Sequence, residues 1–144
     1  MKRAALPIVL LALAVPAGAH GKKWVAPADA IARPNPVPKG AEAVARGKAL
    51  YTEQCENCHG PKGKGDGPDA KPGHDAPHDL SSPALQARMT DGEILWKLTT
   101  GNTVDGHVVM PAFSEDIPSE EDRWKVVHYV RTLKGTESAK PHAH

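Results

Sequence analysis

The chain has 144 residues, with 18 lysine and arginine residues against 17 aspartate and glutamate residues. This length suits a single domain, and the balanced charge argues against the basic stripe of a nucleic-acid-binding protein and against an acidic tail. Aromatic residues make up only 4% of the chain. We therefore expect the polypeptide alone to build a thin hydrophobic core.

The first 19 residues have the pattern of a secretory signal peptide. A positive start at Lys2 and Arg3 precedes an apolar stretch over residues 6–15, and an A-x-A-like site ends at Ala19. This pattern predicts cleavage after Ala19 and an exported, periplasmic protein. An uncleaved N-terminal anchor is the alternative. The apolar stretch is too short to span a bilayer comfortably, so we expect no transmembrane span in the mature form.

Residues 20–40 form a leader with four prolines, which favour extended backbone. They predict an extended segment that wraps the domain or links it to a partner, with a disordered linker as the alternative. Ala41–Gln54 predicts the first helix, because it is rich in alanine and other strong helix formers. Gly47 lies inside this helix, where glycine costs about 1 kcal/mol relative to alanine. We therefore expect another backbone to come close at Gly47.

A C-x-x-C-H pentad directly follows this helix, and its Cys55 and Cys58 are the only cysteines of the chain. The pattern is typical of c-type haem attachment, in which two thioether bonds hold the porphyrin and His59 ligates the iron. A thioredoxin-like pair would need a preceding βαβ pattern, which the sequence lacks. A zinc site would need both thiols and two of His59, His74 and His78. A plain disulfide is compatible with export.

Residues 60–79 predict a long loop, because they contain five glycines and four prolines. Loops of this length are usually functional, and wrapping one edge of a cofactor is a sufficient function. His74 and His78 in this loop are expected to face solvent. The loop also contains four aspartates that lack the spacing of a calcium-binding loop: Asp66, Asp69, Asp75 and Asp79.

The remaining sequence predicts short helices and no regular strands. A short helix is expected within residues 81–88, a second from Asp91 to about Thr100 behind a capping box, and a last helix that opens at about Pro118 and ends near Leu133. His128 in the last helix is expected to be a partly buried packing residue. Residues 102–117 are expected to be irregular, and residues 136–144 to form a disordered polar tail. The predicted fold class is all-α, with one domain over residues 41–135 wrapped around one covalently bound haem.

Met110 is the expected second axial ligand. It precedes Pro111 in the predicted irregular segment, where rigid backbone can hold a thioether toward iron. Met89 lies at the mouth of a helix and is interpreted as a packing residue. His107 is the competing candidate and would give a bis-histidine site. A thioether stabilises ferrous iron relative to imidazole, so ligation by His59 and Met110 predicts a high reduction potential.

These motifs together resemble a class I cytochrome c of the mono-haem, bacterial periplasmic type. The resemblance covers about residues 41–133 and depends on Gly47 and Tyr51 before the pentad, on Met110-Pro111, and on V-V-H-Y-V at residues 126–130. It implies that the first and last helices cross, with Gly47 and Tyr51 against Val126 and Tyr129. It also implies haem c bound through Cys55 and Cys58, with His59 and Met110 as metal ligands.

The resemblance has further implications around the cofactor. A backbone carbonyl near Pro68 or Pro72 would orient His59 through its Nδ1–H. Trp96 or Arg88 would reach a haem propionate. The proline-rich leader and the histidine-rich loop depart from the compact pattern of the family.

The function implied by the resemblance is one-electron transfer between respiratory partners in the periplasm, without enzymatic activity. The partners would be redox proteins or a membrane-bound respiratory complex, and nucleic acid is not expected. Two alternatives stay open. One is a cytochrome subunit docked to a larger oxidoreductase, with the leader as a docking strap. The other is a five-coordinate haem enzyme or gas sensor, which requires that Met110 does not ligate the iron.

Overall fold

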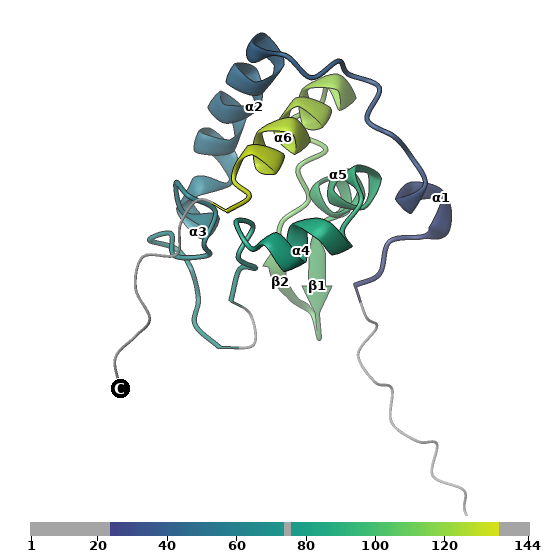
Figure 1. Ribbon diagram of the computed structural model, residues 1–144. Coiled ribbons are helices and arrows are strands. Elements are labelled where there is room, and N and C mark those ends of the chain that lie inside the picture. Colours follow the sequence, from purple (N-terminus) through teal and green to yellow (C-terminus); the bar gives the residue numbers. More distant parts are fainter. Residues whose placement is uncertain (1–23, 74–75, 136–144) are drawn as a thin grey trace, which may run out of the picture.

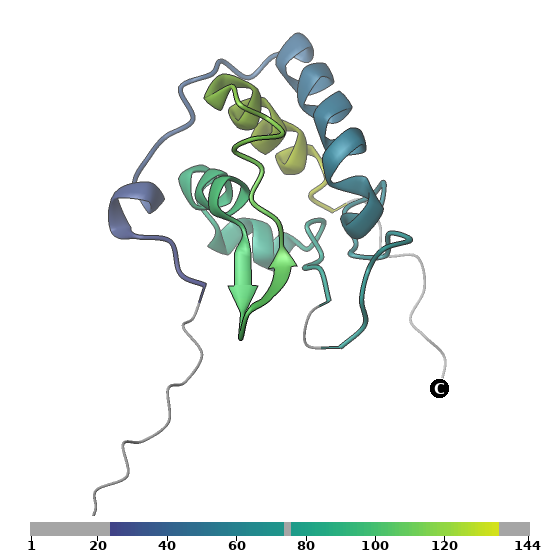
Figure 2. The ribbon, with the colours of Figure 1, turned by 180° about the vertical axis from the view of Figure 1, so that it is seen from behind.

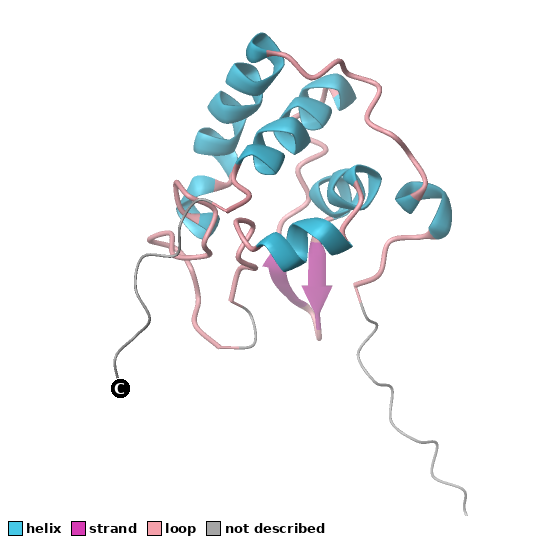
Figure 3. Ribbon diagram, viewed as in Figure 1, coloured by secondary structure: helices cyan, strands magenta, loops and turns pink. Residues whose placement is uncertain are grey.

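A computed structural model of the protein describes residues 24–73 and 76–135. The predicted signal peptide, the predicted tail and His74 lie outside these residues. Figure 1 and Figure 3 show short helices, long loops and one small hairpin. The elements are α1 (Ala28–Ile31), α2 (Ala41–Gln54), α3 (Glu56–His59), α4 (Pro83–Arg88), α5 (Asp91–Thr100), β1 (Asn102–Val104), β2 (His107–Met110) and α6 (Glu120–Thr132). In the described part of the chain, no helix has the length and apolar character needed to cross a membrane.

Three helices begin at the capping residues that the sequence offers. The side-chain oxygens of Ser82, Thr90 and Ser119 each accept a hydrogen bond from the backbone N–H three residues further on. Each bond satisfies one of the N–H groups that the first helical turn leaves unpaired. Gly101 ends α5 with a φ of 64°, a conformation that glycine adopts readily. The predicted bounds of α2 and α5 are confirmed, and the all-α class is confirmed apart from the hairpin.

The helices α2 and α6 lie side by side, as Figure 1 and its reverse view in Figure 2 show, and Gly47 lies where their backbones meet. A Cβ atom at Gly47 would overlap the backbone carbonyl oxygen of Lys125 and press on Tyr129. Only glycine therefore allows the two backbones to come this close. Tyr51 is fully buried one turn further along α2, and its ring centroid lies 5.0 Å from that of Tyr129. The implied crossing is confirmed, with Lys125 rather than Val126 nearest to Gly47.

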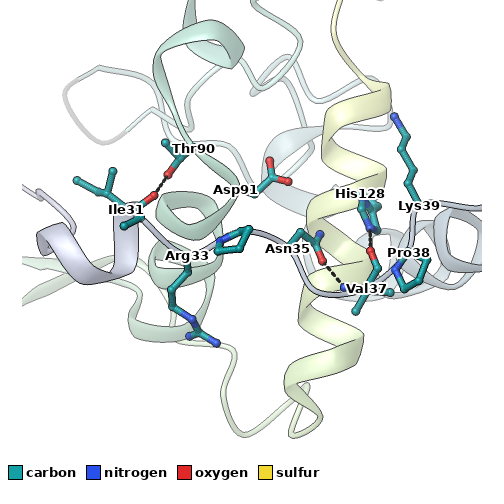
Figure 4. A pocket seen from close by; sticks show the side chains of 11 residues that line it. Ile31, Arg33, Asn35, Val37, Pro38, Lys39, Thr90, Asp91 and His128 are labelled. Atoms are coloured by element: carbon teal, nitrogen blue, oxygen red, sulfur yellow. Dashed lines mark hydrogen bonds between the residues drawn. The ribbon is translucent and has the colours of Figure 1, made fainter.

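The described part of the leader, residues 24–40, packs against α5 and α6 and contains the short helix α1, which was not predicted. Figure 4 shows two of its contacts. The Thr90 hydroxyl donates a hydrogen bond to the Ile31 carbonyl at 2.8 Å, and Nε2 of His128 lies 2.7 Å from the Val37 carbonyl oxygen. His128 is buried, with 6% of its surface exposed. It packs in the interior, as predicted, and its ring also contacts the leader.

Residues 102–110 form a hairpin and not the predicted irregular segment. The strands β1 and β2 pair antiparallel around Asp105 and Gly106, which have φ angles of 49° and 82°. Two consecutive residues with positive φ match the twist of a tight hairpin, and Asp-Gly is a strong sequence signal for it. The strands are too short to display a clear alternation. Met110 consequently ends a strand and does not lie in a loop.

Asp122 connects α6 to α2 through Arg46, whose Nη2 lies 2.6 Å from Asp122 Oδ2. The hydrogen bond from Arg46 holds the pKa of the Asp122 carboxyl below its ordinary value. Because this pKa is lower in the folded than in the unfolded protein, the ionised Asp122 stabilises the fold at pH values above the unfolded-state pKa of about 3.9. The contribution disappears as the pH falls from there through the folded-state pKa.

We therefore expect Asp122→Asn to lower the midpoint of denaturant unfolding at neutral pH, and this effect to shrink as the pH falls below the unfolded-state pKa of about 3.9. Unfolding curves of both proteins across this pH range measure the difference. Glu115→Gln, at an exposed position outside α6, is the control. A loss of stability that is equal at neutral and acid pH would contradict the electrostatic origin of the effect.

Candidate functional site

The chain passes from α2 into α3 with continuous hydrogen bonding. The Cys55 N–H donates to the Tyr51 carbonyl, and the His59 N–H donates to the Cys55 carbonyl, both at 2.8 Å. A single helical turn therefore carries Cys55, Cys58 and His59. Both thiols are free; Cys55 is buried and Cys58 is half-buried.

The state of Cys55 argues against a thioredoxin-like redox pair. Burial raises the pKa of the Cys55 thiol to about 12, and the neighbouring Cys58 adds to the shift. Cysteines of redox-active C-x-x-C pairs instead have lowered pKa values. Among residues 24–73 and 76–135, no group of three or more His, Cys, Asp or Glu side chains could hold a metal ion. His74 and Asp75, which the zinc and calcium alternatives would use, lie outside these residues.

A backbone carbonyl orients the His59 ring. Nδ1 of His59 lies 3.3 Å from the carbonyl oxygen of His78. A proton on Nδ1 leaves Nε2 with a free lone pair, which is the form that binds a metal. Burial holds the pKa of His59 below its usual value, so the neutral ring is favoured. The prediction of a carbonyl near Pro68 or Pro72 was wrong, because the acceptor is the residue directly after Pro77.

A cavity of about 400 Å³ lies beside α3 and is lined by Cys55, Cys58 and His59. Met110 reaches it from β2, so the structure brings all four predicted site residues to one cavity. The rest of the wall is mostly apolar and comes from α5, α6, the hairpin, the loop over residues 76–80 and the segment after β2, including Leu80, Ile94, Leu98, Val109, Phe113, Val126 and Val130. His107 is exposed and is not among the lining residues. Met89, predicted to be a packing residue, lines the same cavity.

The segment that carries Met110 is connected to α5 on both sides, by strand pairing and by a backbone hydrogen bond. Asn102 directly follows the glycine that ends α5, and it pairs with Met110 across the hairpin. A Cβ atom at Gly101 would lie 2.6 Å from the Met110 carbonyl oxygen, so glycine is needed where the strand returns. On the other side, the Phe113 N–H donates to the Leu98 carbonyl at 3.0 Å. Met110 is thus held between two fixed points of the backbone.

Trp24 and Lys97 are among the polar residues of the cavity wall that sequence reasoning missed. Nζ of Lys97 lies 4.9 Å from the ring centroid of Trp24. Trp96 and Arg88, the donors suggested by the resemblance, are not among the lining residues. No signal in the sequence indicates Trp24, because the leader reaches the cavity only through tertiary packing.

Two free cysteines at C-x-x-C-H spacing, beside an apolar cavity under two crossed helices, define a c-type cytochrome, a protein whose haem carries single electrons. The family described as cytochrome c oxidase, cbb3-type, subunit III matches residues 42–130. This match covers more than half of the chain, and the chain belongs to that family.

A solved structure supports this fold, and a second one aligns more weakly. A chain of the Kuenenia stuttgartiensis reducing HAO-like protein complex aligns with a TM-score of 0.56 and 28% identity, over 69% of this chain and 47% of that one. The protein thus spans about half the length of that relative. The c-type cytochrome XoxG from Methylobacterium extorquens AM1 aligns with a TM-score of 0.46 and 25% identity, over 69% of this chain and 61% of that one. No curated protein matches the sequence.

The cavity fits the covalently bound haem that this family carries. Both thiols are free to form thioether bonds, and the wall is mostly apolar, as a porphyrin ring requires. No aspartate or glutamate lines the cavity within the described residues, so nothing there repels the haem propionates. The indole Nε1–H of Trp24 is buried without a hydrogen-bond partner. The cofactor is one haem c, bound through Cys55 and Cys58.

Proposed function

We propose that the protein is a one-electron carrier in which His59 and Met110 ligate the haem iron. The observation that supports this most directly is that His59, oriented by the His78 carbonyl, and Met110, held by the hairpin, line the cavity that contains both cysteines. When bound, the haem supplies one-electron chemistry. The residues of the chain attach it, orient it and exclude water from it. Ligands retained in both oxidation states keep structural rearrangement small, which favours fast transfer.

We further propose that the protein is exported to the periplasm and exchanges electrons there with redox proteins or a membrane-bound respiratory complex. The signal-peptide pattern of residues 1–19 supports export. We assign no catalytic residue, because iron ligated by both His59 and Met110 has no open position for a substrate.

A mass measurement with a pyridine haemochrome spectrum tests the attachment. The protein is made in a host that matures c-type cytochromes. We expect it to weigh one haem more than its polypeptide and to give the spectrum of a thioether-linked haem. The control, with Cys55→Ala and Cys58→Ala together, should lose the covalent haem. A colourless wild-type protein with the mass of its amino acids alone would refute the function.

A second candidate is a cytochrome subunit of a larger oxidoreductase. It is favoured by the description of the family as an oxidase subunit and by the aligned chain that is part of a protein complex. Size-exclusion chromatography of the protein from its native source separates the two candidates. A free carrier elutes at the size of a single small domain, whereas a subunit elutes together with its partner.

A further inference from the structure

Trp24 places a buried hydrogen-bond donor without a partner at the haem cavity. Buried side-chain nitrogens that lack a partner occur at three residues of the described chain, Trp24, Arg123 and Trp124. Of these residues, Trp24 lines the cavity. A buried N–H without an acceptor is costly, so native proteins nearly always supply one. The missing acceptor is therefore expected from the group that occupies the cavity.

The charge of the cavity wall indicates what this acceptor is. Lys97 lines the wall beside Trp24, with its Nζ 4.9 Å from the ring centroid. The Lys97 ammonium is also paired with Glu93 at 2.8 Å, so it is held in place. A haem has two carboxylates, and a buried carboxylate needs hydrogen bonds and positive charge. The indole N–H and the ammonium supply both at one point of the wall.

Trp24 is held in place by the docking of the leader. The bonds in Figure 4 attach the leader to α5 and α6 at Ile31 and Val37, and the Asn35 amide donates to the Trp124 carbonyl at 3.2 Å. Gly92 allows close approach, because a Cβ atom there would overlap the Ala30 carbonyl oxygen. The leader therefore carries Trp24 to the cavity as an ordered segment.

We propose that Trp24 binds the haem: its indole Nε1–H donates a hydrogen bond to one propionate, beside the Lys97 ammonium. The leader lies before residues 42–130, which the family matches. The proposed haem contact thus comes from outside the residues that the family matches. The inference requires haem in the cavity but does not depend on which residues ligate the iron or on the electron-transfer partner.

The first test uses the unaltered holoprotein labelled with ¹⁵N. The chain has three tryptophans, and their indole N–H resonances are assigned by substitution. We expect the Trp24 resonance to lie at lowest field, as for an N–H bound to a carboxylate. It should also shift most between the ferric and ferrous states, because the propionate is part of the haem. A Trp24 resonance that does not respond to the oxidation state would overturn the proposal.

The second test compares Trp24→Phe with Trp96→Phe, a half-buried tryptophan of α5 that does not line the cavity. Phenylalanine keeps a ring against Lys97 but removes the donor. Without the donor, the propionate charge acts more strongly on the iron, so the midpoint potential of Trp24→Phe should fall. The propionate pKa should rise, which makes the potential vary with pH where the wild-type value is constant. Equal potentials and pH profiles for the two variants would overturn the proposal. If Trp24→Phe fails to mature, the resonance measurement decides.

Discussion

Replacing Gly47 with valine is expected to lower the free energy of unfolding by about 3 kcal/mol, at the upper end of the usual cost of overpacking. The first added atom would overlap the Lys125 carbonyl oxygen. This oxygen belongs to the backbone of α6 and cannot rotate away, so the two helices must separate. Separation also pulls Tyr51 from Tyr129 beside the start of the pentad. Denaturant unfolding of the ferric holoprotein, followed by haem absorbance, measures the loss.

Ala49→Val provides the matched control in the same helix. Ala49 is exposed, so the new side chain meets solvent, and the expected cost is only the lower helix propensity of valine, about 0.6 kcal/mol. We expect Gly47→Ala to lower stability less than Gly47→Val does. Its Cβ atom also clashes, but alanine favours the helix over glycine by about 1 kcal/mol. Equal unfolding midpoints for Gly47→Val and Ala49→Val would show that the crossing does not require glycine.

Replacing Met110 with alanine is expected to lower the midpoint potential by roughly 0.1–0.3 V, part of the ~0.8 V range that axial ligands cover. In the proposed ligation the Met110 thioether would stabilise ferrous iron, and alanine has no atom to replace it. We also expect the far-red sulfur–iron charge-transfer band to disappear and the ferrous protein to bind carbon monoxide. Visible spectroscopy and a redox titration measure all three effects.

Met89→Ala is the matched control, because Met89 lines the same cavity. As a packing residue, it should lower stability but leave the far-red band and the potential close to those of the wild type. If Met89→Ala loses the band and Met110→Ala keeps it, the ligand is Met89. A wild-type protein that already binds carbon monoxide and lacks the band would instead support the five-coordinate enzyme or sensor.

Features with local causes were predictable. The starts of α4, α5 and α6 follow from side chains that cap the N–H three residues ahead, an interaction contained within one turn. The hairpin was not predicted although its cause is also local, because its strands are too short to alternate visibly and its signal lies in the Asp105-Gly106 turn. The His78 carbonyl was missed for a different reason: the loop after α3 must fold back before any of its oxygens can reach His59.

The sequence by itself determined the covalent chemistry of this cytochrome. The C-x-x-C-H spacing places Cys55, Cys58 and His59 within one helical turn, and Gly47 marks the point where another backbone must approach. Tertiary structure alone decided what completes the cavity. Met110 reaches it through the register of a hairpin, His78 through a folded loop, and Trp24 through a leader docked on α5 and α6. These residues are distant along the chain. Tertiary packing alone brings them to the cavity, because no local spacing in the sequence relates their positions.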